Sequence, residues 1–164
     1  MNTRKLAVSA ALLAACGVAN AAPKEWDSEF SFFGFITNTD SFSSANVNAS
    51  YGYYFSDNFV ATMGLSVSGT DTDGGNDEIT TGGSVAARYN FVTTGSTPYL
   101  EAAYRVSDFD ESSDTGFVDA KVGYNAYVGD NVGIFIEGGY GFSTSDGQAD
   151  DGVFIGQFGI RVFL

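Results

Sequence analysis

The feature that most constrains the fold is the alternation of side chains in the last stretch of the chain, 152–164. Phe154, Phe158, Ile160, Val162 and Leu164, together with Gly156, occupy every second position up to the final residue, and the positions between them include Gln157, Gly159 and Arg161. A period of two residues indicates a β-strand, because successive side chains of a strand point to opposite faces. Most soluble domains end instead in a polar or frayed tail. The chain is therefore expected to end on a strand with one apolar face.

The spacing within this strand resembles a known signal. Gln157-x-Gly159-x-x-Val162-x-Leu164 is similar to the polar-x-Gly-x-x-hydrophobic-x-hydrophobic pattern that ends outer-membrane β-barrel proteins and is read by their assembly machinery. That family usually ends in Phe, whereas this chain ends in Leu164 and has Phe163 on the opposite parity. The resemblance implies a C-terminal assembly signal and the barrel-assembly machinery as a partner. The final strand of a soluble sandwich is the alternative.

The N-terminus has the layout of a secretory signal peptide. Two basic residues precede an apolar run at 6–15, and a small-residue A-x-A cleavage site ends at Ala21. We therefore predict a signal peptide at 1–21 and one mature domain at 22–164. The resemblance identifies this mature domain as an outer-membrane β-barrel domain.

A second interpretation of the N-terminus stays open. Residues 13–16 resemble a lipobox, in which case Cys16 would become the lipidated first residue of a lipoprotein. A β-barrel needs no lipid anchor, so cleavage after Ala21 is favoured. The mature chain then has no cysteine and no disulfide.

Composition excludes two classes of function. Once 1–21 is removed, five basic residues remain against 20 acidic ones, a formal charge of −15. Nucleic-acid binding is excluded, because phosphate contacts require a basic surface. The chain also has no histidine, the residue with which enzymes of this size and class activate a nucleophile or a water. We therefore expect no enzyme, no catalytic residue and no cofactor.

Seven further alternating segments, separated by turn signals, precede the last strand. They lie at 29–37, 44–55, 59–69, 80–91, 98–107, 117–128 and 132–144. No apolar run reaches the roughly 20 residues of a membrane-spanning helix, whereas an even number of strands of about 9 to 11 residues is what a small transmembrane barrel requires. The expected fold class is all-β, an eight-stranded antiparallel up-and-down transmembrane β-barrel.

The connections between these segments alternate in character. Those after the second, fourth and sixth strands are short turns, for example at 56–58, and those after the third, fifth and seventh are polar and acidic. Outer-membrane barrels have short periplasmic turns and longer extracellular loops. We expect the acidic loops on the extracellular side and both termini on the periplasmic side.

Alternation alone does not say which face is outside, because a soluble lipocalin-like barrel has the same period. Aromatic residues gather near the strand ends, such as Phe55 and Phe59 at the turn rim and Tyr140 and Phe142 at the loop rim, as in the aromatic girdles of membrane barrels. The polar faces carry little charge, unlike a solvated exterior. These features favour an apolar exterior and the cell outer membrane. The mature chain as a whole resembles the small eight-stranded outer-membrane barrels of the OmpA/OmpX type.

Charged residues on the inward face form the candidate site. They are Arg88, Glu101, Arg105, Asp119, Lys121, Glu137 and Arg161. Eight strands leave an interior that side chains can fill, so we expect an ion network that plugs the lumen, with a polar pore as the alternative. Positions counted from the turn rim place Arg88 and Glu101 at similar heights on adjacent strands, Arg105 facing Asp119, and Glu137 between Lys121 and Arg161.

The predicted loops are rich in carboxylates. Asp71-Thr72-Asp73-Gly74-Gly75 superficially resembles a Ca²⁺ loop, but the third ligand position and the distant glutamate of an EF-hand are missing. Asp71, Asp73, Asp77 and Glu78 are at most weak candidates for divalent cations. We predict no dedicated metal site. A solvated acidic rim is the simpler interpretation, and weak divalent-cation bridging to the phosphates of lipopolysaccharide is the other.

The sequence predicts a location more closely than a role. We expect a monomeric, non-enzymatic outer-membrane protein that contributes to envelope integrity or surface interaction, with outer-membrane lipid and lipopolysaccharide as partners. A narrow porin-like channel for small solutes is the alternative, suggested by small inward residues: Thr62, Gly64, Ser66, Gly82, Ser84 and Ala86. A soluble or lipid-anchored ligand-binding barrel is the third possibility.

Overall fold

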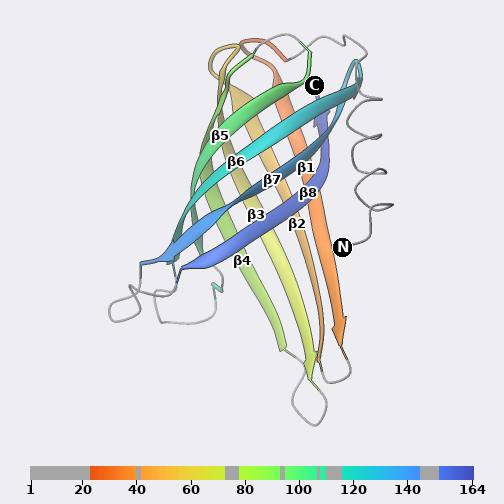
Figure 1. Ribbon diagram of the computed structural model, residues 1–164, viewed down its shortest axis with the longest axis vertical. Helices are drawn as coiled ribbons and strands as arrows, with labels where there is room; N and C mark the ends of the chain where they lie inside the picture. The colour runs from red at the N-terminus through yellow and green to blue at the C-terminus, as the bar shows by residue number, and fades with distance from the viewer. Residues whose placement is uncertain are drawn as a thin grey trace, which may run out of the picture.

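The computed structural model describes residues 23–39, 42–72, 78–92, 95–106, 108–109, 116–144 and 152–164. The predicted signal peptide lies outside these ranges. In them, eight antiparallel strands close into a barrel in sequence order (Figure 1). They are β1 (Ser28–Thr39), β2 (Phe42–Tyr54), β3 (Phe59–Thr72), β4 (Glu78–Asn90), β5 (Thr97–Val106), β6 (Gly116–Gly129), β7 (Val132–Ser143) and β8 (Val153–Phe163). The predicted eight-stranded up-and-down barrel is confirmed.

Strand limits differ from the prediction mainly at the loop ends of β2 and β3. Their ladder runs from Tyr54 opposite Val60 to Phe42 opposite Thr72, so β3 continues three residues beyond the predicted end at 69. Residues 70–72 have the sequence Thr-Asp-Thr, so the apolar alternation that marks a strand in the sequence stops before the backbone pairing does. No helix in the described part of the chain is long and apolar enough to cross a membrane.

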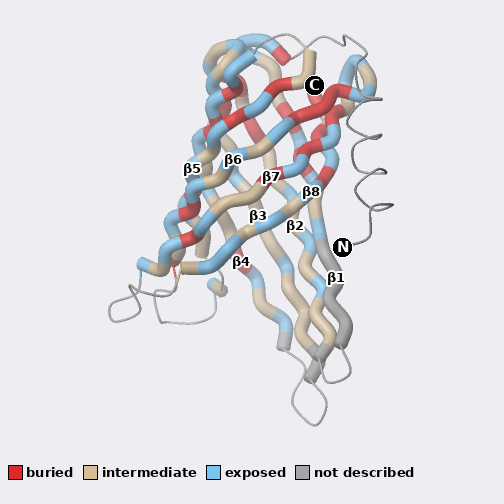
Figure 2. The backbone as a smooth tube through the Cα atoms, viewed as in Figure 1, coloured by how far each residue is buried: buried red, intermediate tan, exposed pale blue. Residues whose placement is uncertain are grey.

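The apolar faces of the strands point outward. Leu65 is 68% exposed and Phe158 is 67% exposed, and large hydrophobic side chains of every strand share this orientation: Phe32, Val47, Met63, Val85, Leu100, Val122, Ile136 and Ile160. The buried residues gather toward the short-turn end of the barrel (Figure 2). This arrangement is the reverse of a soluble lipocalin-like barrel, whose apolar faces would fill the interior.

The barrel closes where β8 meets β1. Five residue pairs join the two strands, from Glu29 opposite Phe163 to Phe33 opposite Gly159. Gly159 is in the last residue pair of this ladder, and a Cβ atom there would collide with the carbonyl oxygen of Phe32 and the side chain of Phe33. Glycine is therefore required at this position by the packing of the seam.

We predict that Gly159→Ala destabilises the barrel and that Gly156→Ala, on the same strand, does not. A Cβ atom at Gly156 meets only the Phe154 ring, at 3.5 Å, an ordinary contact. Overpacking at Gly159 should cost about 1–3 kcal/mol. The measurement is the urea concentration at which half of the protein is unfolded, read on a gel that separates the folded barrel from the heat-unfolded chain. Equal midpoints for the two variants would show that the seam tolerates the added methyl group.

Candidate functional site: the barrel lumen

An apolar plug fills the turn-side end of the lumen. Tyr54, Val60, Tyr127 and Phe163 form one buried cluster, and none is more than 5% exposed. The rings of Tyr127 and Phe163 pack with their centroids 5.3 Å apart. The four residues lie at the turn-side ends of β2, β3, β6 and β8, so their inward side chains converge beside the short turns. The plug therefore closes this end of the lumen.

Directly above the plug, a buried ion pair crosses the barrel. Glu29 of β1 and Arg88 of β4 approach to 2.5 Å and are 0% and 1% exposed. Tyr54 connects the pair to the plug, because its hydroxyl donates to Glu29 Oε2 at 2.9 Å and accepts from Arg88 Nη2 at 3.2 Å. A buried charge is tolerated only when it is paired and hydrogen-bonded, and both conditions hold here.

A second cluster lies around Glu137 at mid-height. Lys121 Nζ is 2.6 Å from Glu101 and 3.0 Å from Glu137. Tyr99 donates to the other oxygen of Glu137 at 2.6 Å, and Gln157 donates to the oxygen that Lys121 approaches. Glu137 therefore has partners on both carboxylate oxygens, and Lys121 is shared between two acids.

Arg161 joins the two clusters. Its guanidinium lies 3.7 Å from Glu29 and 3.7 Å from Glu137. It also donates to Asn125 and lies over the Phe135 ring, 4.1 Å from the centroid. A guanidinium can serve several partners at once, because its five donors lie in one plane.

The last ion pair lies nearer the loops. Arg105 Nε is 3.2 Å from Asp119 Oδ2, and the guanidinium packs 4.5 Å from the centroid of the Phe117 ring. The Arg105 side chain is 33% exposed, whereas that of Asp119 is 4% exposed. The loop-side half of the lumen is therefore wetter than the half above the plug.

The structure brings all seven predicted inward charges into one interior and confirms that Arg88 and Glu101 lie at the same height on β4 and β5, but the two side chains have other partners. Arg88 lies opposite Glu101 in the β4–β5 register, yet its side chain crosses the lumen to Glu29, and Glu101 pairs with Lys121, its neighbour on β6. The expected pair of Arg105 and Asp119 forms, and Glu137 contacts both of the bases expected beside it.

Sequence reasoning missed Glu29, Tyr54 and Tyr99. Glu29 precedes Ser31 and Phe33 on the inward face of β1, so its parity was readable, but aromatic residues on both faces obscured which side was inside. With Glu29 included, the described lumen holds four acids and four bases. Its formal charge is zero, in a chain that is strongly acidic elsewhere.

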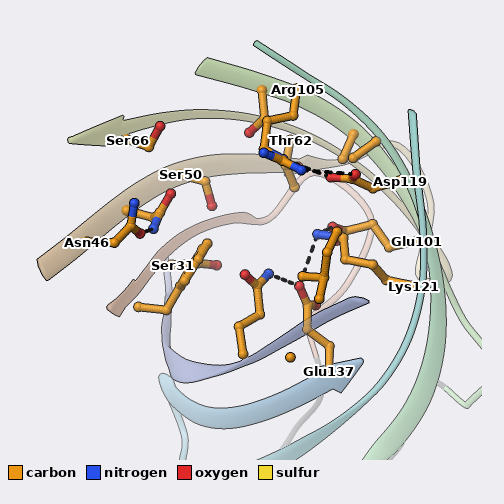
Figure 3. A pocket seen from close by; sticks show the side chains of 18 of the residues that line it. Ser31, Asn46, Ser50, Thr62, Ser66, Glu101, Arg105, Asp119, Lys121 and Glu137 are labelled. Carbon is orange, nitrogen blue, oxygen red and sulfur yellow. Dashed lines mark hydrogen bonds and ion pairs between the residues drawn. The ribbon is translucent and has the colours of Figure 1, made fainter. Parts of the chain in front are cut away.

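A cavity of about 430 Å³, lined mainly by polar residues, occupies the lumen above the plug and reaches down to Ser31, Arg88 and Arg161. Hydroxyl and amide groups of β2, β3 and β4 line one wall, including Asn46, Ser50 and Thr62, and charged residues of β5, β6 and β7 line the other (Figure 3). The plug residues do not border this space. The cavity is therefore a pocket with a closed floor.

Other predicted residues fall outside this site. Asp73 and Asp77 lie beyond the described residues, and the side chains of Asp71 and Glu78 are likewise not described. Among the described residues, no group of three or more His, Cys, Asp or Glu side chains could hold a metal ion.

The residues of the predicted assembly signal divide between the two faces of β8. Gln157 reaches Glu137 in the lumen, and Leu164, at the end of the chain, is exposed on the outer surface. Backbone bonds of 2.9 Å and 3.3 Å join Leu164 to Ser28.

Comparison with known proteins places the fold. No family model matches the chain, and no curated protein matches its sequence. The structure is similar to the N-terminal β-barrel domain of Pseudomonas aeruginosa OprF, with a TM-score of 0.58 and 15% identity over 87% of this chain and 100% of that one. It is also similar to the outer membrane protein OprG from Pseudomonas aeruginosa, with a TM-score of 0.53 and 10% identity over 87% of this chain and 98% of that one. The fold is that of the eight-stranded outer-membrane barrels.

We predict that Glu29→Gln destabilises the barrel far more than Glu101→Gln. The first change leaves Arg88 buried without the acid it pairs with, which costs on the order of 3–5 kcal/mol. The second leaves Lys121 its contact with Glu137. Urea titration of both variants in lipid vesicles measures the difference.

Removal of both charges supplies the control. Glu29→Gln combined with Arg88→Met should recover much of the lost stability, because no orphaned charge remains. If Glu29→Gln and Glu101→Gln shift the midpoint equally, the pair of Glu29 and Arg88 does not have the special role assigned to it.

Proposed function

We propose that the protein is a monomeric, non-enzymatic integral barrel of the cell outer membrane that contributes to envelope integrity or to surface interaction. The observation that carries this proposal is the separation of its surfaces. Among the side chains that the structure describes, the outward faces of the strands are apolar and exposed, whereas the charged side chains of the strands are paired inside, above an apolar plug. The hydrocarbon core of a membrane favours an apolar exterior around a polar interior. A closed barrel also leaves few backbone groups unpaired in that hydrocarbon.

Placement in the outer membrane rests on three further arguments. The predicted signal peptide would export the chain, and the pattern ending in Leu164 resembles the signal that the barrel-assembly machinery reads. The two similar solved structures include an outer membrane protein. Short turns on one rim and acidic loops on the other support a periplasmic floor and an extracellular mouth.

The acidic loops support a surface role. Four acids and four bases balance in the described lumen, and most of the remaining acids fall in the predicted loops, so we expect these loops to carry a strongly negative charge. Lipopolysaccharide phosphates are also negative, so divalent cations would have to bridge the two. We propose such bridging as a weak, many-sited interaction rather than as a dedicated metal site.

A narrow channel is the second candidate function, because the 430 Å³ cavity borders several of the small inward residues, including Thr62, Ser66 and Ser84. The plug argues against it: a solute that entered from the loop side would meet Arg88, Tyr54 and then Tyr127 before reaching the periplasmic rim. We therefore favour a cavity that binds over a pore that conducts.

Planar-bilayer recording tests this choice. The wild-type chain, shown to be folded and inserted, should give no steady conductance. A variant with Tyr54→Ala and Tyr127→Ala, which removes two rings of the plug, should show openings that the wild type lacks. Steady open levels in the wild type would reject the plugged lumen and establish the channel.

A further inference from the structure

The β1–β8 seam is closed on the turn side only. Pairing between these strands ends at Phe33 and Gly159. Beyond that point, residues 34–39 of β1 pair only with β2, and residues 153–158 of β8 pair only with β7. The two strands diverge toward their loop ends (Figure 1). At about 3.3 Å per residue, six unpaired residues leave an opening roughly 20 Å long.

The other short ladder of the barrel is covered, which sets this seam apart. β4 also extends beyond its partner β5, whose pairing ends at Gly83 opposite Val106. There the chain that follows β5 continues along β4, and the Phe109 amide donates to the Thr81 carbonyl oxygen at 2.8 Å. No such cover lies over the β1–β8 gap among the described residues.

The gap leads into the polar cavity. Phe33 on β1 borders the cavity from one side of the gap, and Val153 and Ile155 on β8 border it from the other. The outer face of the same β8 segment carries Phe154, which is 77% exposed, and Phe158. The opening therefore lies within the apolar exterior and connects it with the interior of the barrel.

An open pair of strand edges at this height needs a partner. In hydrocarbon, unpaired backbone groups are tolerated only where they are covered by protein or line a wet cavity. The opening here is apolar at its margin, through Phe33, Val153 and Ile155, and polar farther in, through the hydroxyl and amide wall. That gradient matches an amphiphile with its chain in the gap and its headgroup in the cavity.

Charge selects the kind of headgroup. The described lumen holds four acids and four bases, and the exposed edge of its network is the Arg105–Asp119 pair. A headgroup with one phosphate and one ammonium group can meet both signs, whereas a lipid with several phosphates would require an excess of bases. A volume of about 430 Å³ lies within the range of small-molecule sites.

We propose that the β1–β8 gap is a lateral portal through which a zwitterionic glycerophospholipid places its headgroup in the lumen cavity while its acyl chains stay in the bilayer. This inference rests on the proposed membrane location. It assigns the cavity a ligand that enters from the side of the barrel rather than along its axis.

Single-tryptophan fluorescence tests the portal, because Trp26 is the chain's one tryptophan. In a Trp26→Phe background, Phe33→Trp reports from inside the gap and Phe158→Trp reports from the outer surface at the same level, next to Gly159. Ile155→Trp is a second inside reporter, on the other side of the gap. Each full mature chain is folded into phosphatidylcholine vesicles that contain lipid with brominated acyl chains or lipid with a nitroxide on the choline headgroup.

The acyl-chain bromines should quench Phe158→Trp strongly, because it faces hydrocarbon. The headgroup nitroxide should quench Phe33→Trp severalfold more than Phe158→Trp, because only a headgroup inside the barrel reaches that depth. It should also quench Ile155→Trp, which lies nearer the loop end of β8. Unlabelled phosphatidylethanolamine should reverse this quenching more effectively than phosphatidylglycerol.

The failures are distinguishable. If bromines quench Phe158→Trp but the nitroxide quenches neither inside reporter, the portal is wrong and the membrane barrel stands. If cross-linking then shows a dimer joined through the seam, a second copy covers the gap instead of lipid. If the bromines do not quench Phe158→Trp, the proposed membrane location itself fails.

Discussion

The pairing of Glu29 with Arg88 is the contact on which the rest of the interior depends. Eight strands enclose a lumen too narrow to hydrate an isolated charge well, and Arg88 is almost completely inaccessible to solvent. Tyr54 of the apolar plug donates a hydrogen bond to Glu29, and Arg161 lies between Glu29 and the cluster around Glu137. Each charge above it is then balanced by a neighbour, and the lumen is neutral inside an acidic protein.

The two ends of the barrel are built differently. At the turn side, inward aromatic side chains and long charged side chains fill the space, and all eight strands are hydrogen-bonded around the circumference. At the loop side, the inward residues of β2–β4 are serines, threonines and asparagines, too short to meet in the middle. The cavity and the open part of the β1–β8 seam both follow from this change in side-chain size and pairing. The floor is closed by packed side chains, and the cavity above it is accessible from the loop side.

Much of the fold was predictable, because strand periodicity is a local property of the sequence. Alternation around residues such as Leu65 and Phe158 located the strands and separated the two faces of each. The aromatic residues at the strand ends and the weak charge of the polar faces then indicated which face is outside, and the turn signals indicated the strand order. Contacts between adjacent strands were also predictable, as for Arg105 and Asp119. Contacts across the lumen were not: strand register places Arg88 beside Glu101, but a long side chain can span a narrow barrel and choose Glu29. The uneven length of the β1–β8 ladder depends on the shape of the closed barrel, which no local pattern encodes.

Magic-angle-spinning NMR of the protein in lipid bilayers tests the central contact most directly. Nitrogen–carbon dipolar dephasing should place the Arg88 guanidinium in contact with the carboxyl carbon of Glu29, and measurements on Glu29→Gln and Glu101→Gln variants identify which carboxylate is responsible. We predict that the Arg88 dephasing is lost in Glu29→Gln and kept in Glu101→Gln. Loss in Glu101→Gln alone would show that Arg88 pairs with its neighbour in the strand register, and the ion pair across the lumen between Arg88 and Glu29 would then be wrong.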